Sequence, residues 1–147
     1  MSELSKEIVG QKLPPFKFDV ERGKVAEFCT AIGETNPVYT NIEEAKKAGY
    51  DDTPIPLTFQ TTFTFWGYTE FWNDLGKMGI DIQKLLHMKE EYTYHKPIYP
   101  GTTVTCSLEV TDVKTGKMNM VTFGGSFSDK DGNPFITSQM AIVIRPD

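Results

Sequence analysis

The sequence contains few of the residues that mark metalloproteins and disulfide-stabilised proteins. It has only two cysteines, Cys29 and Cys106, and two histidines, His87 and His95. The cysteines lack the spacing of a metal site or a redox pair, so we interpret them as buried, reduced thiols. Carboxylates are not spaced around the histidines as in a metal site, and we predict neither a metal nor a cofactor.

Long apolar runs and long basic runs are also missing. No stretch approaches the length that spans a membrane, and residues 1–7 lack the apolar core of a signal peptide. We therefore expect a cytoplasmic protein without a membrane partner. Lys and Arg number 15 against 20 Asp and Glu, and the longest basic run is the pair Lys46-Lys47. This balance argues against a nucleic-acid partner.

The first third of the chain predicts a strand and two helices. A length of 147 residues suits a single domain, 1–147. Phe16 and Phe18 are aromatic and follow two prolines, as at the start of a strand. Asp19 is a candidate N-cap for a helix that ends at Gly33, and residues 42–49 predict a second, charged helix. The buried face of the first helix is predicted from the spacing of Val25, Phe28, Cys29 and Ile32.

The middle of the chain predicts a loop followed by a buried helix. Two prolines within residues 51–56 exclude a regular helix there. Residues 57–72 are mostly apolar or threonine, which is typical of a helix buried on nearly all sides. Residues 82–86 predict a further helical turn.

From His87 onward, the apolar residues recur with a period of two, which indicates strands buried on one face. Turn signals at residues 114–117 and 129–134 separate three such strands. The clearest alternation is that of Val104, Cys106, Leu108 and Val110. Helices followed by an antiparallel meander predict the α+β class, with the helices on one face of the sheet.

The most specific signal is the loop Gly33-Glu34-Thr35-Asn36-Pro37-Val38-Tyr39. Together with residues 9–16 and 92–102, it resembles the MaoC-like dehydratases and the FAS1-like dehydratase domain, a family that includes R-specific enoyl-CoA hydratases. The family loop reads Gly-Asp-x-Asn-Pro-[Ile/Leu/Val]-His, so Glu34 replaces the aspartate and Tyr39 replaces the histidine. The resemblance covers nearly the whole chain and implies a hot dog fold, in which a curved antiparallel sheet wraps around a long central helix.

The resemblance also implies the chemistry of this loop. In the family, the aspartate and histidine act on one water at the double bond of a 2-enoyl thioester, while a backbone N–H at the start of the central helix holds the thioester oxygen. Glu34 keeps a carboxylate on a longer side chain. The Tyr39 phenol, with a reference pKa of about 10, cannot cycle a proton as readily as imidazole. Asn36 and Pro37 match the family motif and are expected to fix the shape of the loop.

Four further residues are candidates for substrate contacts. Thr58 lies at the start of the central helix, where many active members of the family have glycine. His95 lies in the matching segment 92–102 and is a candidate substitute acid or base. Phe59 and Phe63 belong to an aromatic concentration that we interpret mainly as core, with the remainder lining an acyl or ring-shaped pocket.

The replacements at Glu34 and Tyr39 favour a substrate-binding, catalytically degenerate subunit whose MaoC-like partner carries the aspartate and the histidine. Its ligand would be an acyl-CoA or acyl-carrier-protein thioester in fatty-acid or acyl-CoA metabolism. One alternative is a self-sufficient hydratase that uses Glu34 with Tyr39 or His95. Two others are a non-enzymatic acyl-thioester binding protein and a hot dog thioesterase. Because hot dog domains pair through their sheets, the resemblance implies a homodimer or a heterodimer.

Overall fold

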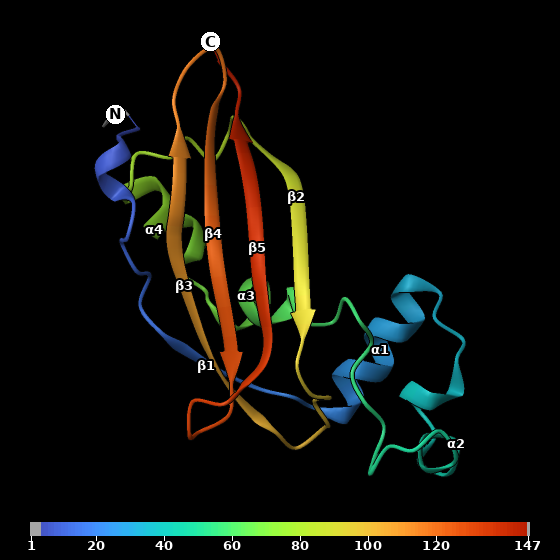
Figure 1. The fold of residues 1–147 in the computed structure, drawn as a ribbon. Coiled ribbons are helices and arrows are strands. Elements are labelled where there is room, and N and C mark those ends of the chain that lie inside the picture. Colours follow the sequence, from blue (N-terminus) through green and yellow to red (C-terminus); the bar gives the residue numbers. More distant parts are fainter. Residues whose placement is uncertain (1–3, 147) are drawn as a thin grey trace.

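The chain folds into a five-stranded antiparallel sheet with its helices on one side. The computed structural model describes residues 4–146, so residues 1–3 and 147 of the predicted domain lie outside the described part. The strands lie side by side (Figure 1) in the order β1 (Phe16–Asp19), β3 (Thr103–Lys114), β4 (Asn119–Ser128), β5 (Pro134–Ile144) and β2 (Leu85–Tyr94). All neighbouring strands pair antiparallel.

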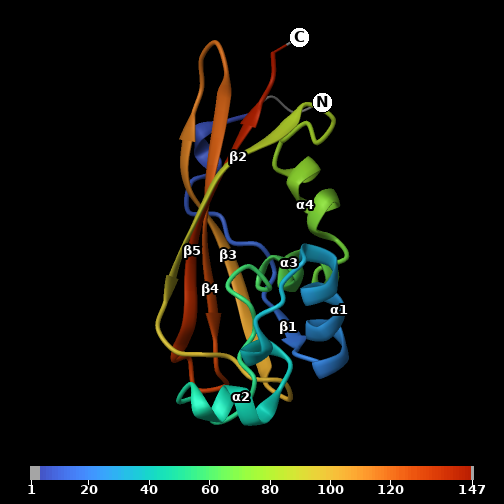
Figure 2. The same cartoon turned by 90° about the vertical axis from the view of Figure 1, so that its right-hand side faces the viewer.

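The helices lie against one face of this sheet. Figure 2 shows the sheet edge-on, with α1 (Arg22–Ile32), α3 (Thr61–Gly67) and α4 (Phe71–Lys77) on the same side and α2 (Ile42–Lys47) at its lower end. Two short 3-10 helices, η1 (Lys6–Ile8) and η2 (Pro37–Tyr39), lie in the connecting segments. The predicted α+β class and hot dog fold are confirmed.

The core lies between the helices and the concave face of the sheet. Every second residue of β3 from Val104 to Val110 is buried, which confirms the predicted alternation. A bulge after Val110 shifts the register and turns Val113 inward as well. From the helical side, Phe63 packs against Phe127 of β4 with ring centroids 5.6 Å apart.

The first helix ends as predicted but starts later. Gly33 adopts the left-handed conformation (φ 69°), and its N–H bonds to the last turn of α1. The prediction of Asp19 as N-cap is wrong, because Asp19 pairs with Thr103 in the sheet and its carboxylate accepts a hydrogen bond from that hydroxyl (2.6 Å). The prediction that Ile32 is buried is also wrong. Its side chain is 50% exposed at the end of the helix, beyond the core.

The helix predicted over residues 57–72 is divided in two. Residues 57–60 form turns, α3 follows, and the chain leaves the helical conformation at Tyr68 (φ −121°, ψ 82°) before α4 begins. The break buries the Tyr68 ring against Phe16, with centroids 5.0 Å apart, and its hydroxyl donates to Asp74. Burial of this ring outweighs the continuation of the helix.

Of the helical turn predicted at residues 82–86, only a single hydrogen-bonded turn forms, in which the Lys84 N–H donates to the Asp81 carbonyl (3.1 Å). Leu85 already pairs with Ile144 as the first residue of β2, so hydrogen bonding to β5 overrides the local preference. No helix within residues 4–146 is long and apolar enough to cross a membrane.

Candidate functional site

The motif loop is fixed by hydrogen bonds within itself. The Glu34 N–H donates to the Cys29 carbonyl (2.8 Å), which places Glu34 directly after α1. The Glu34 carboxylate accepts the N–H of Asn36 (2.8 Å), and the Asn36 side-chain oxygen accepts the N–H of Val38 (3.1 Å). Asn36 is therefore the N-cap of η2, with Pro37 at its first position. The Glu34 carboxylate is thus engaged in shaping the loop.

Tyr39 ends η2 and is partly buried. Burial raises the pKa of its phenol, and the nearby negative charge of Glu34 raises it further. Tyr39 therefore keeps its proton at neutral pH. It can donate a hydrogen bond to a ligand but cannot take a proton from water.

Tyr39 lines a pocket of about 230 Å³. The pocket joins residues from the motif loop, from the segment before α3, and from the end of β2 with the residues after it. Its polar side chains are three tyrosines, one histidine and one lysine, and no carboxylate of residues 4–146 lines it. The complete lining is Tyr39, Tyr50, Pro54, Ile55, Pro56, Leu57, Tyr94, His95, Lys96, Pro97, Ile98 and Ile136.

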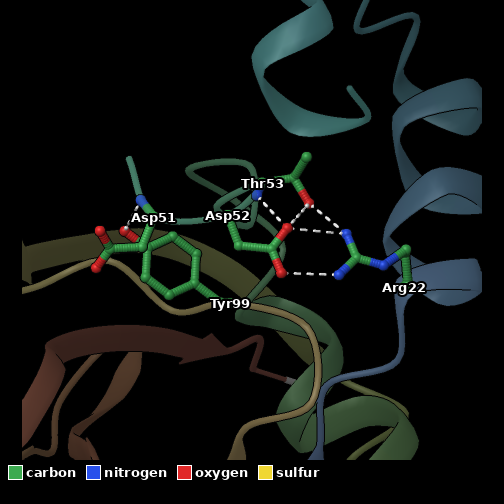
Figure 3. Close-up of polar contacts among 5 residues, drawn as sticks. All are labelled: Arg22, Asp51, Asp52, Thr53 and Tyr99. Atoms are coloured by element: carbon green, nitrogen blue, oxygen red, sulfur yellow. Dashed lines mark hydrogen bonds and ion pairs between the residues drawn. The ribbon is translucent and has the colours of Figure 1, made fainter. Parts of the chain in front are cut away.

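A polar cluster holds one wall of this pocket in place (Figure 3). The Arg22 guanidinium of α1 binds both carboxylate oxygens of Asp52 (3.1 and 2.8 Å) and the hydroxyl of Thr53 (2.9 Å). The hydrogen bonds from Arg22 lower the pKa of Asp52. On the other side of the loop, the N–H of Asp51 donates to the Tyr99 hydroxyl (3.3 Å). The loop is therefore attached at residues 51–53, directly before the segment from Pro54 to Leu57 that lines the pocket.

His95 lines the pocket directly after β2. Its backbone N–H donates to the Phe135 carbonyl (2.8 Å), and its Nε2 lies 3.2 Å from the Thr137 hydroxyl. Lys96 pairs with Asp129 (2.8 Å) and lies over the Phe135 ring, so its charge is already partly compensated. The structure thus brings His95 and Tyr39 to one pocket.

The other predicted residues lie elsewhere. Thr58 is exposed in the turn before α3, where its carbonyl accepts the N–H of Thr61 (3.2 Å). Phe59 and Phe63 are fully buried in the core and contact Phe18. None of the three lines the pocket.

Two of the pocket tyrosines, Tyr94 and Tyr50, were not predicted from the sequence. Tyr94 carried a usable signal, since it stands in the family-like segment 92–102 beside His95. Tyr50 carried none, because it follows the charged helix α2 and reaches the pocket only through the fold.

The cysteines and the acidic residues of the described part of the chain form no second site. Burial raises the pKa of Cys29, and it raises the pKa of Cys106 to about 12, so both remain thiols. Within residues 4–146, no group of three His, Cys, Asp or Glu side chains is arranged to hold a metal ion.

Known proteins resemble this chain in sequence. The family model described as FAS1-like, dehydratase domain region, matches residues 7–138. A UPF0336 protein of Thermobifida fusca is 31% identical over 134 residues, which covers 90% of this chain and 88% of the relative. A UPF0336 protein of Clavibacter michiganensis is 34% identical over 143 residues, covering 96% and 95%.

Solved structures share the fold. The HadBC (3R-hydroxyacyl-ACP dehydratase) complex of Mycobacterium tuberculosis contains a chain with a TM-score of 0.79 at 22% identity, covering 92% of this chain and 96% of that one. A chain of the ChsH1–ChsH2 complex of the same organism has a TM-score of 0.73 at 20% identity, and the match covers 92% of this chain and 90% of that one. The (R)-hydratase of A. caviae, involved in PHA biosynthesis, gives 0.70 at 17% identity, covering 94% and 96%.

Proposed function

Because this chain belongs to the FAS1-like dehydratase family, we propose that it is a subunit of an R-specific 2-enoyl-thioester hydratase or 3-hydroxyacyl-thioester dehydratase. In this proposal it is the substrate-binding, catalytically degenerate member of a hetero-oligomer. The ligand is an acyl thioester of coenzyme A or of a carrier protein. Its partner is a MaoC-like subunit that carries the aspartate and the histidine.

The main support for this proposal is that neither replaced side chain, Glu34 or Tyr39, is placed to accept a proton in the pocket. Hydration needs a group that removes a proton from water and a group that manages the proton at the α-carbon. The Tyr39 phenol is protonated at neutral pH, and burial raises its pKa further. The Glu34 carboxylate accepts a backbone hydrogen bond and does not line the pocket. Of the two replaced side chains, Tyr39 offers the pocket a hydrogen-bond donor and Glu34 offers it no base, which suits binding better than proton transfer.

An unpaired strand edge supports the proposed partnership. β2 is the last strand of the sheet and pairs with β5 alone among the described strands. Leu86 and Met88 on this strand are each 50% exposed. An exposed edge with apolar side chains is a template for pairing with another sheet. The structurally similar HadBC and ChsH1–ChsH2 chains belong to complexes, and we propose that β2 of this chain meets a partner of that kind.

The test compares this chain alone with the assembly recovered from its native cell. Hydration of crotonyl-CoA is followed by the loss of absorbance of the conjugated thioester. We expect no turnover by the chain alone and rapid turnover by the assembly. Hydration by the isolated chain at a rate similar to that of the assembly, abolished by Glu34→Gln, would refute the degenerate role.

A second candidate is a self-sufficient hydratase, because Tyr39 and His95 line the same pocket. In that case His95 would act as the base and Tyr39 as the donor. This candidate predicts that His95→Ala and Tyr39→Phe each abolish turnover by the isolated chain. Turnover that survives both substitutions excludes this candidate.

A further inference from the structure

A second, smaller cavity lies beside the pocket on the same face of the sheet. Its volume of about 20 Å³ accommodates one group of the size of a water molecule. Strand register places the two spaces next to each other. Ile136 lines the pocket and pairs with Tyr94, whereas Ser138, two residues along β5, lines the cavity and pairs with Tyr92. Both Ile136 and Ser138 are buried, so they face the same side.

A hydrogen-bonded pair separates these two spaces. Tyr94 lines the pocket, Gln60 lines the cavity, and the Gln60 Nε2 donates to the Tyr94 hydroxyl oxygen (3.2 Å). Both side chains also donate to the Leu57 carbonyl. The Tyr94 side chain is 47% exposed, so it can swing outward without unpacking the core. Its movement would join the pocket and the cavity into one continuous site.

Gln60, which lines the cavity, carries a buried acceptor without a donor. Gln60 is 1% exposed, and its Oε1 has no hydrogen-bond partner among the described residues. The nearby Thr61 hydroxyl is already engaged with the Tyr92 hydroxyl, which itself donates to Glu90. Buried polar atoms normally find partners. The group that fits here is small and donates a hydrogen bond, which describes either a water molecule or the hydroxyl of a ligand that displaces it.

We propose that Tyr94 gates the passage from the pocket to the cavity, and that Gln60 Oε1 accepts a hydrogen bond from a hydroxyl at the distal end of the bound chain. This inference rests on the proposed acyl-thioester function and narrows its ligand class to chains with a terminal hydroxyl, separate from any hydroxyl at the reacting carbons. A methyl-terminated chain of the same length fills the cavity but leaves Gln60 Oε1 unpaired, which weakens binding by about tenfold.

The test measures dissociation constants by calorimetry for the purified chain. The ligands are acyl-CoA thioesters from butanoyl to hexadecanoyl, each with a terminal methyl or a terminal hydroxyl. We expect one chain length at which the hydroxyl strengthens binding by about tenfold. Gln60→Met keeps the approximate volume and should remove this preference. Thr93→Ala is the matched control on the opposite face of β2 and should retain it.

A Gln60→Met variant that fails to fold is replaced by Tyr94→Phe, which keeps the Gln60 acceptor and removes the hydrogen bond that closes the gate. That variant should bind the preferred hydroxylated ligand several-fold more tightly, and unchanged affinity refutes the gate.

Acyl-CoA binding without a hydroxyl preference at any chain length overturns this inference and leaves the proposed function standing. If the chain binds free, terminally hydroxylated fatty acids through Gln60 but does not bind acyl-CoA, the proposed function is overturned and the role of Gln60 is supported. Absence of binding to both ligand classes overturns both.

Discussion

Tyr39 stands where the family has its histidine, and its environment determines what it can do. The phenol is partly buried at a largely apolar pocket, and the negative charge of Glu34 acts on it. Both surroundings disfavour a phenolate, first through the loss of solvation and then through like charge. Tyr39 can therefore orient a ligand oxygen as a donor, and this is the role that a substrate-binding subunit needs.

Glu34→Gln should lower the pKa of Tyr39, although burial will keep it above the ordinary value. Because the folded-state pKa is raised, the phenol's contribution to the free energy of unfolding is complete below the unfolded pKa of about 10 and is lost as the pH rises through the folded pKa. NMR titration of the Tyr39 ring carbon, compared between the wild type and Glu34→Gln, measures the shift. Identical curves would show that Glu34 does not act on Tyr39.

Asp52 should make stability depend on pH in the acidic range. Its pKa is lowered in the folded state by Arg22, so its contribution is present above the unfolded value of 3.8 and is lost as the pH falls through the folded pKa. Asp52→Asn should lower the free energy of unfolding by about 1 kcal/mol or less at pH 7, since the Arg22–Asp52 ion pair is partly exposed. It should also flatten the acid limb of the stability curve. Urea unfolding from pH 7 to pH 3 measures both effects, and an unchanged acid limb would contradict the assignment.

The strands were more predictable from the sequence than the helices, for a physical reason. Each strand of the meander buries one face, so apolar residues such as Cys106 and Leu108 alternate with polar ones and can be recognised from the local sequence. The break after α3 depends on contacts with β1, more than 40 positions away in the chain, that no local pattern contains. The same holds for Leu85, which is a strand residue because Ile144 pairs with it.

A pair of glycine substitutions tests the close approach of α3 to β1. A Cβ on Gly67 would lie 2.8 Å from Phe18 Cδ2, whereas a Cβ on Gly76 in α4 would meet nothing within 4 Å. Gly67→Ala should therefore destabilise the protein by about 1–3 kcal/mol despite the higher helix propensity of alanine. Gly76→Ala should stabilise it by about 0.5–1 kcal/mol. Chemical denaturation measures both, and stabilisation by both substitutions would contradict the packing at Gly67.

The pocket belongs to the molecule as a whole, since it combines residues from four separate parts of the chain. The motif loop identified Tyr39 from the sequence alone, because its neighbours in the motif are its neighbours in space. Tyr50, Leu57 and Ile98 reach the same pocket only after the sheet and helices have assembled. Sequence reasoning could name these residues only with knowledge of the fold.

The exposed edge strand gives a prediction about assembly. Met88→Lys places a charge on β2, where it would have to be desolvated in a paired sheet, so we expect the affinity for the partner subunit to fall by about tenfold or more. Met118→Lys is the matched control, because Met118 is also exposed (58%) but lies between β3 and β4. Light scattering after size-exclusion chromatography measures the assembled fraction. Equal loss in both variants would place the interface elsewhere.

The most direct test of the degenerate role is the hydration rate of the assembled enzyme after substitutions in each subunit separately. We expect Glu34→Gln with Tyr39→Phe in this chain to leave the turnover number of crotonyl-CoA within about threefold of the wild type. Replacing the partner's aspartate or histidine should lower it by about a hundredfold or more, as expected for the loss of a general acid or base. The opposite result would identify this chain as the catalytic one: turnover would be lost after Glu34→Gln with Tyr39→Phe, and it would be kept after replacement of the partner's aspartate or histidine.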